Sequence, residues 1–136
     1  MHPDIPARAK ADSMKLIDVI TSYTDEMTAI RRDIHQHPEI GFEEKRTAAL
    51  VAEKLKSWGV DEVATGIGGT GIVATIRGRG PGRSVGLRAD MDALPMVEET
   101  NLPYRSRHEG AFHGCGHDGH TTMLLGAAKY LAETKN

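Results

Sequence analysis

The spacing of hydrophobic residues near the N-terminus predicts two helices separated by a proline turn. From Ser13 to about His37, apolar positions recur close to every 3.6 residues, as one face of a helix requires. Ser13 is a suitable N-cap, and Pro38 is expected to end the helix because the residue before a proline avoids helical geometry. A second helix is predicted from about Phe42 to Gly59, with two glutamates in its first turn.

The pattern then changes to short runs that are typical of strands. β-Branched residues predict strands at 60–64 and 72–76, joined by a glycine-rich turn. A nearly continuous apolar run at 84–89 predicts a third, buried strand. After an irregular stretch, a last helix is predicted from around His117 to about Glu133. This order predicts an α/β fold in which helices flank a mixed sheet.

Composition narrows the class of protein. The chain has 136 residues, of which 39% are hydrophobic and 26% charged, as in soluble globular domains. A formal net charge of −2 and an aromatic content of 4% argue against a nucleic-acid partner. No apolar run is long enough for a membrane span, and the start lacks the apolar core of a signal peptide, so we expect no membrane partner and a cytoplasmic location. Residues 1–12 are expected to form a flexible arm.

Residue types that bind metals gather near the start of the last helix. Four of the seven histidines lie between positions 108 and 120, beside the only cysteine, Cys115. A glycine separates Cys115 from His117, so both side chains can reach one ion, and a thiolate with an imidazole suits zinc or another borderline divalent metal. His120 lies about one helical turn beyond His117, and Asp118 could accept a hydrogen bond from an imidazole.

The alternative to a metal ligand is that Cys115 is a small buried residue, as free cysteines often are. The density of ligand types within residues 113–120 favours the metal over this alternative. A closed structural zinc site is disfavoured because it usually contains paired cysteines, and a single cysteine also excludes an internal disulfide.

Two carboxylates follow the third predicted strand. Asp90 and Asp92 lie at its C-terminal end, which is the edge where open α/β sheets bind ligands. An extended backbone would place both on one side, where either could orient a metal ligand or assist proton transfer. A solvated strand end before Pro95 is the alternative.

Two further motifs favour structural roles. His35 and His37 are two residues apart, which does not place them on one helix face, so a polar helix end is favoured over a ligand pair. The glycine-rich segment 66–71 precedes a strand rather than a helix and is not followed by Lys-Ser or Lys-Thr. A hairpin turn is therefore favoured over a phosphate-binding loop.

Three segments, 31–44, 87–95 and 113–120, together resemble the N-terminal signatures of the M20 metallopeptidase-like amidohydrolases. The most similar branch contains hippurate hydrolases, N-acyl-amino-acid amidohydrolases and auxin-conjugate hydrolases. The resemblance implies a catalytic domain that holds two divalent ions, which we expect to be Mn²⁺ or Zn²⁺, with Co²⁺ or Ni²⁺ as further candidates. It also implies an inserted lid domain that mediates homodimerisation, and hydrolysis of the amide bond of small N-acyl amino acids.

The resemblance also implies roles for individual residues. Cys115 and His117 match two metal ligands, and Asp90 matches an aspartate that orients a metal-bound histidine in related peptidases. Arg88 stands where those relatives have a histidine ligand, so that role does not transfer, and no ligand role is assigned to His120. The family's general-base glutamate, its remaining ligands and the lid have no counterpart before Asn136.

Residues 13–136 are therefore expected to form the N-terminal portion of a catalytic metal-binding domain that is inactive alone. Two other functions stay open from the sequence. A non-catalytic metal-binding module would bind about one ion through Cys115. A thiol enzyme would use the same cysteine with a nearby histidine and would keep its activity in the presence of a chelator.

Overall fold

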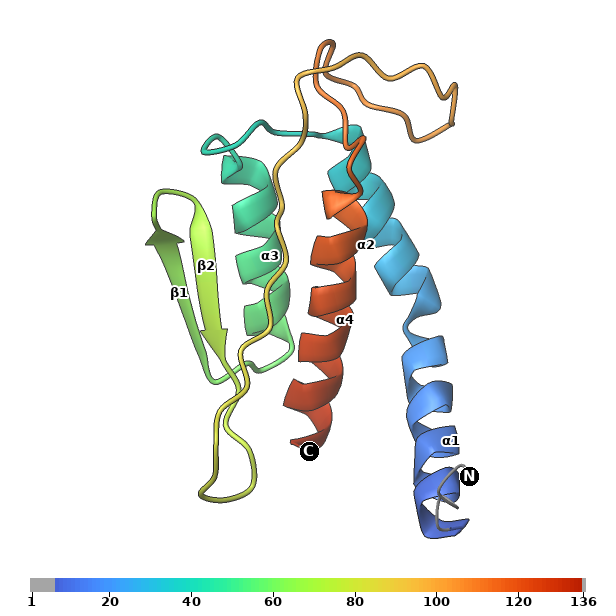
Figure 1. Cartoon of the computed structure of the whole chain (residues 1–136), viewed down its shortest axis with the longest axis vertical. Helices are drawn as coiled ribbons and strands as arrows, with labels where there is room; N and C mark the ends of the chain where they lie inside the picture. The colour runs from blue at the N-terminus through green and yellow to red at the C-terminus, as the bar shows by residue number, and fades with distance from the viewer. Residues whose placement is uncertain (1–6, 136) are drawn as a thin grey trace, which may run out of the picture.

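The computed structural model describes residues 7–135 and contains four helices and a two-stranded antiparallel sheet within that range. The helices and strands, shown in Figure 1, are α1 (Ala7–Ser22), α2 (Thr24–Gln36), α3 (Lys45–Ser57), β1 (Glu62–Ile67), β2 (Gly71–Thr75) and α4 (His117–Thr134). Helix α4 packs against both α2 and α3, and the hairpin lies against the other side of α3. The arrangement confirms the predicted α/β class.

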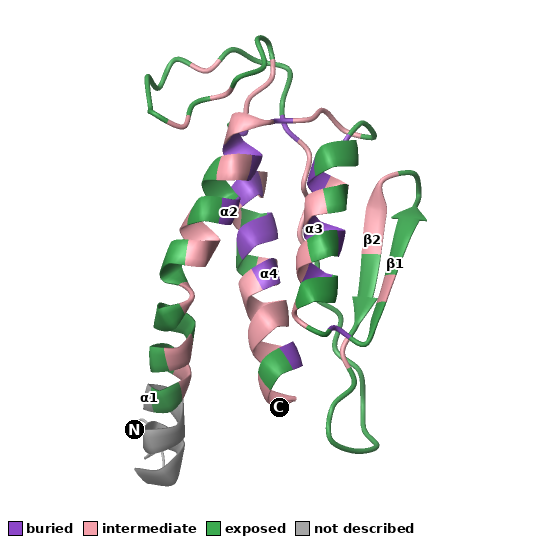
Figure 2. Cartoon of the chain, turned by 180° about the vertical axis from the view of Figure 1, so that it is seen from behind, coloured by how far each residue is buried: buried purple, intermediate pink, exposed green. Residues whose placement is uncertain are grey.

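The hydrophobic core lies where these three helices meet. Ile34 of α2 is fully buried, and it belongs to one cluster with Leu55 of α3 and Leu125 of α4. Figure 2 shows that the buried positions lie on the sides of the helices that face one another, whereas the hairpin is mostly exposed. Within residues 7–135, no helix is both long and apolar enough to cross a bilayer.

The first predicted helix is divided in two. Helix α1 begins at Ala7, so Ser13 does not cap it and residues 7–12 of the expected arm are helical; residues 1–6 lie outside the described part of the chain. A turn at Tyr23 separates α1 from α2. Hydroxyl side chains explain the break, because Ser22 and Thr24 each donate to a backbone carbonyl three residues earlier and compete with the helical ladder. Helix α2 ends at Gln36, before the proline, as predicted.

Helix α3 begins at Lys45 rather than near Phe42, because Phe42 has a φ of 69° and cannot continue a right-handed helix. The two glutamates expected in the first turn therefore precede it. The carboxylate of Glu39 caps the helix instead, and it accepts hydrogen bonds from the backbone N–H groups of Arg46 at 2.8 Å and Thr47 at 2.7 Å. The end of the helix is as predicted, with Gly59 at a φ of 73° just beyond it.

The glycine-rich segment forms the predicted hairpin turn between β1 and β2. The two strands pair from Glu62 with Thr75 to Ile67 with Gly71, with a bulge next to Ile67. Gly71 is required at this bulge, because a Cβ there would lie 2.5 Å from the carbonyl oxygen of Ile67. A phosphate-binding loop is therefore not formed.

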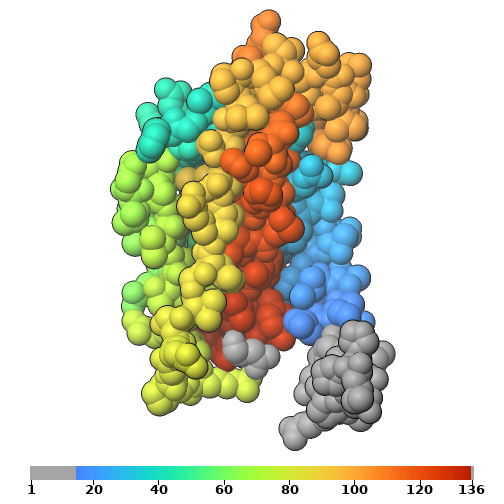
Figure 3. All heavy atoms as spheres, viewed as in Figure 1, coloured from blue at the N-terminus to red at the C-terminus, as the bar shows by residue number. Residues whose placement is uncertain are grey.

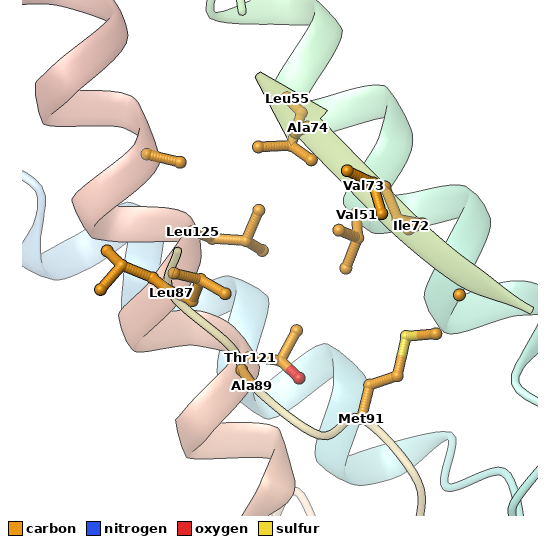
Figure 4. Close-up of a pocket in the computed structure, with 13 residues that line it drawn as sticks. Val51, Leu55, Ile72, Val73, Ala74, Leu87, Ala89, Met91, Thr121 and Leu125 are labelled. Atoms are coloured by element: carbon orange, nitrogen blue, oxygen red, sulfur yellow. The ribbon is translucent and has the colours of Figure 1, made fainter. Parts of the chain in front are cut away.

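The predicted third strand at 84–89 is not formed within the described residues. The segment is extended, but no strand pairs with it, and Val85 and Leu87 are 83% and 61% exposed. Figure 3 shows it on the surface between the hairpin and α4. A cavity of about 330 Å³ separates it from β2, with Ile72 on one side and Leu87 on the other (Figure 4). Without a neighbour at hydrogen-bonding distance, the segment cannot join the sheet.

Candidate metal centre

His117 is the first residue of α4, and Asp92 fixes the orientation of its ring. Its Nδ1 lies 2.8 Å from a carboxylate oxygen of Asp92 and 3.0 Å from the backbone carbonyl oxygen of the same residue. Both oxygens accept, so Nδ1 carries the proton and the lone pair of Nε2 remains for a metal. A carboxylate behind a ligating imidazole is a common arrangement in metal sites, since it sets the tautomer and raises the basicity of the ligand.

Asp90, the supporting carboxylate expected from the sequence, has a different partner. Its side chain is 44% exposed and accepts two hydrogen bonds from Arg88, at 2.7 and 3.0 Å. The hydrogen bonds from Arg88 lower the pKa of Asp90. The carboxylate that contacts His117 in this structure is that of Asp92, whereas Asp90 is held by Arg88.

Cys115 precedes α4 and is an exposed free thiol. Gly116 lies between it and His117 with a φ of 92°, a left-handed turn that L-residues with a side chain rarely adopt. This turn separates the cysteine from the histidine in the chain, at the N-terminal end of α4. The ring of His120 lies with its centroid 5.4 Å from that of His117.

Cys115 and His117 are chemically suitable ligands for a divalent metal, but two ligands are fewer than such an ion usually has. A thiolate and an imidazole suit Zn²⁺ and related ions, which usually have three or four protein ligands. Within residues 7–135, no group of three or more His, Cys, Asp or Glu side chains is placed to hold one ion. The described residues therefore do not complete a metal site by themselves.

Asp118, in the first turn of α4, belongs to a buried ionic cluster in which its carboxylate contacts two side chains of α2. Its side chain is 1% exposed, and one carboxylate oxygen lies 2.8 Å from Nδ1 of His35 and 3.2 Å from Nε of Arg31. The other ring nitrogen of His35 lies 3.1 Å from the carboxylate of Glu98. The cluster thus joins α2, α4 and the loop between residues 98 and 106.

The four histidines between positions 108 and 120 do not form one cluster in space. His113 is only 4% exposed, burial lowers its pKa, and neither ring nitrogen has a hydrogen-bond partner in the described part of the chain. His108 packs edge-on against His37, with ring centroids 5.9 Å apart. Of these four histidines, His117 and His120 are therefore the pair at the start of α4.

Sequence reasoning missed three polar residues that hold the surrounding segments in place. His35 was assigned to a polar helix end, yet it is buried and contacts two carboxylates. Glu98 and Glu39 were not singled out, although each carboxylate accepts several hydrogen bonds. For Glu39, its position just after Pro38 and shortly before a helix was a usable signal. For Glu98, the sequence contains no comparable signal.

Comparison with known proteins identifies the family. Residues 86–136, which include Asp92, Cys115 and His117, match the model of peptidase family M20/M25/M40. The chain belongs to this family. The hippurate hydrolase of Campylobacter jejuni is 55% identical to this M20 chain over 119 residues, which cover 88% of the chain and 31% of that protein.

Two other relatives support the same assignment. The N-acyl-L-amino acid amidohydrolase of Geobacillus stearothermophilus is 42% identical over 93% of this chain and 33% of its own length. A crystal structure from Bacillus subtilis, described as a dinuclear metal binding peptidase from the M20 family, matches with a TM-score of 0.80 and 37% identity, over 85% of this chain and 32% of that one. The M20 chain thus spans about a third of the length of these relatives.

These comparisons confirm the predicted resemblance and the predicted fold. The helices and the hairpin correspond to part of an M20 catalytic domain, and the relatives are hydrolases of amide bonds. The name of the solved neighbour states that it binds two metals, in agreement with the class of cofactor expected for this chain.

Proposed function

We propose that this chain contributes to the metal centre of an amidohydrolase that cleaves the amide bond of N-acyl amino acids with an activated water molecule. The observation that carries the proposal is the contact between the Asp92 carboxylate and Nδ1 of His117, two residues after the free thiol of Cys115 in the chain. It is the arrangement that a ligating histidine requires. The activities named for the relatives support the choice of substrate class.

The residues of this chain have separate tasks in the proposed centre. Cys115 and Nε2 of His117 would hold a divalent ion, and we propose Mn²⁺ or Zn²⁺, with Co²⁺ or Ni²⁺ as alternatives. Asp92 would keep the imidazole in the ligating tautomer. When bound, such ions supply a Lewis acid that makes water nucleophilic near neutral pH and polarises a carbonyl group. Because the described residues place no third ligand beside these two, we propose that the 136-residue chain is inactive alone.

Binding of Co²⁺ by the 136-residue chain tests the partial site directly. Thiolate coordination gives a charge-transfer band in the near ultraviolet, so titration with Co²⁺ should produce this band in the unmodified chain. Cys115→Ser should abolish the band, and His117→Gln should weaken binding strongly. The matched control is His108→Gln, an exposed histidine of the same cluster, which should bind as the unmodified chain does. Absence of the band in the unmodified chain would refute the partial site.

Hydrolysis tests the proposed reaction. The 136-residue chain with Mn²⁺ or Zn²⁺ should release no glycine from hippurate above the level given by the metal alone. A longer polypeptide that spans the full length of the relatives should release glycine, and His117→Gln should abolish this activity. Metal-dependent turnover by the short chain would contradict the inactivity proposed for it.

A non-catalytic metal-binding module is the second candidate, favoured by the incomplete ligand set. A full-length form that binds metal through Cys115 but hydrolyses no N-acyl amino acid would support it. The homodimer and the cytoplasmic location stay predictions, to be checked by light scattering of that longer form and by cell fractionation.

A further inference from the structure

His35 lies at the centre of the buried ionic cluster and joins three segments of the chain. It is 4% exposed and lies one residue before the end of α2. Its Nδ1 is 2.8 Å from a carboxylate oxygen of Asp118, and its Nε2 is 3.1 Å from a carboxylate oxygen of Glu98. Both edges of the ring are therefore occupied by acceptors from distant parts of the sequence.

The contact with Asp118 fixes the first turn of α4. Asp118 directly follows His117, is fully buried, and its backbone carbonyl oxygen accepts a hydrogen bond from the hydroxyl of Thr122 at 2.7 Å. Arg31 shares the carboxylate oxygen that faces His35. Rotation or displacement of this turn would break these contacts, so α2 holds the backbone from which His117 projects.

The contact with Glu98 fixes the loop that leads to Cys115. The side chain of Glu98 is 2% exposed and accepts hydrogen bonds from the backbone of Ser106 and the hydroxyl of Thr100. The ring of Phe112, shortly before the cysteine, packs edge-on against His35 with centroids 5.6 Å apart. Thus the same imidazole braces the polypeptide on both sides of Cys115.

Buried ionic groups contribute little net stability compared with apolar side chains of the same size. Their effect is on geometry, because each partner left without the other would be a desolvated charge. Here the geometry that they define is that of the segment carrying Cys115 and His117. His37, two residues beyond His35, shows the contrast, since its hydrogen bond at 2.8 Å is to Asp33 of its own helix.

We propose that His35 is a positioning residue for the metal centre, acting mainly through Asp118 to direct His117 and Cys115 toward one ion. This inference rests on the proposed function and deepens it. It assigns a role to a histidine that has no contact with the proposed ligands among the described residues.

Two substitutions separate the contacts of His35. In His35→Asn, the amide nitrogen replaces Nδ1 and can still donate to Asp118; in His35→Gln, it replaces Nε2 and can reach only Glu98. Removal of a direct hydrogen-bond partner of a metal ligand typically weakens affinity by about 10- to 100-fold, and His35 acts one contact further from the ligands. His35→Gln should therefore weaken Co²⁺ binding by about tenfold, the lower end of this range, and alter the near-ultraviolet band, whereas His35→Asn should stay within about threefold of the unmodified chain. His37→Gln is the matched control and should leave affinity and band unchanged.

A second measurement needs no metal. In the metal-free chain, the ¹⁵N chemical shifts of the His117 ring report its tautomer and its contact with Asp92. They should change in His35→Gln and be restored in His35→Asn. Thermal unfolding of each variant separates a change in geometry from loss of the fold. If both substitutions prevent folding, Asp118→Asn, which keeps the shape of the side chain, replaces them and should give the same weakening.

The outcomes distinguish this inference from the proposed function. If the unmodified chain does not bind Co²⁺, the partial site fails, and the His117 ring shifts still decide whether His35 positions that ring. Unchanged affinity, band and ring shifts in His35→Gln, with only a lower unfolding temperature, would make His35 purely structural and overturn the inference. Equal losses in the Asn and Gln variants would overturn the route through Asp118.

Discussion

Asp92 and Asp90 lie two residues apart, yet their carboxylates face different partners. Asp92 accepts from His117, whereas Asp90 accepts from Arg88. Asp92→Asn removes the negative charge behind the imidazole and weakens the contact that sets its tautomer, so we expect Co²⁺ affinity of the chain to fall by about tenfold. Asp90→Asn is the matched control and should change affinity much less. A larger loss in the Asp90 variant, measured by the same titration, would reverse the two assignments.

The pKa of Glu98 provides a prediction about acid stability. Burial alone would raise this pKa, but hydrogen bonds from Ser106, Thr100 and His35 outweigh burial and lower it below the ordinary value of 4.5. A carboxyl group with a depressed pKa in the folded state contributes stability above its unfolded pKa, and the contribution is lost as the pH falls through the folded pKa. The unfolding temperature should therefore fall as the pH is lowered below about 4.5.

Glu98→Gln checks this cause, because a neutral amide cannot lose the same charge. Its unfolding temperature should be lower near neutral pH and should depend less on pH in the acid range than that of the unmodified chain. Part of the dependence should remain, since Asp61 and Glu133 also have lowered pKa values. Glu99→Gln, at an exposed neighbouring position, should keep the original dependence.

The predictability of the site differs from residue to residue. The concentration of ligand types in a short segment was enough to single out Cys115 and His117. The sequence could not show whether Asp90 or Asp92 contacts His117, because both follow the same extended run. The two differ in the structure because Arg88 donates to Asp90. His35 could not be recognised, because its partner Asp118 lies 83 residues away in the sequence.

At the level of the elements, the cap of α3 is the feature that determines where the helix begins. The Glu39 carboxylate accepts from two backbone N–H groups and from the hydroxyl of Thr47. Loss of a helix cap costs about 0.5–2 kcal/mol, so Glu39→Ala should lower the free energy of unfolding by about 1–2 kcal/mol in a urea titration. Glu43→Ala, at an exposed position before the helix, is the control and should have little effect. A similar loss in both variants would argue against the cap.

Element types were predicted more accurately than their boundaries. The hairpin and the ends of α2 and α3 depend on glycine, proline and β-branched residues, whose backbone preferences are local. The break at Tyr23 and the start of α3 depend on side chains that compete for or satisfy backbone groups. The segment 84–89 has the composition of a strand, but a strand needs a neighbour, and within residues 7–135 it has none.

At the level of the whole molecule, the cavity between β2 and the segment 84–89 exposes apolar side chains to solvent. We expect it to bind a hydrophobic dye such as anilinonaphthalene sulfonate and to increase its fluorescence. Leu87→Lys places a charge in this cavity and should reduce the fluorescence, whereas Val85→Lys, at a residue that does not line it, should not. Equal fluorescence in all three chains would mean that the dye binds elsewhere.

The long sequence separation between His35 and Asp118 also has a consequence in time. Contacts that close a long loop form later than local ones, because the chain must first lose more conformational entropy. The β1–β2 hairpin joins neighbouring segments, but the packing of α2 against α4 brings together residues 83 positions apart in the sequence. We therefore expect the hairpin to form early and the contact between His35 and Asp118 to form last, on a chain that is already largely folded.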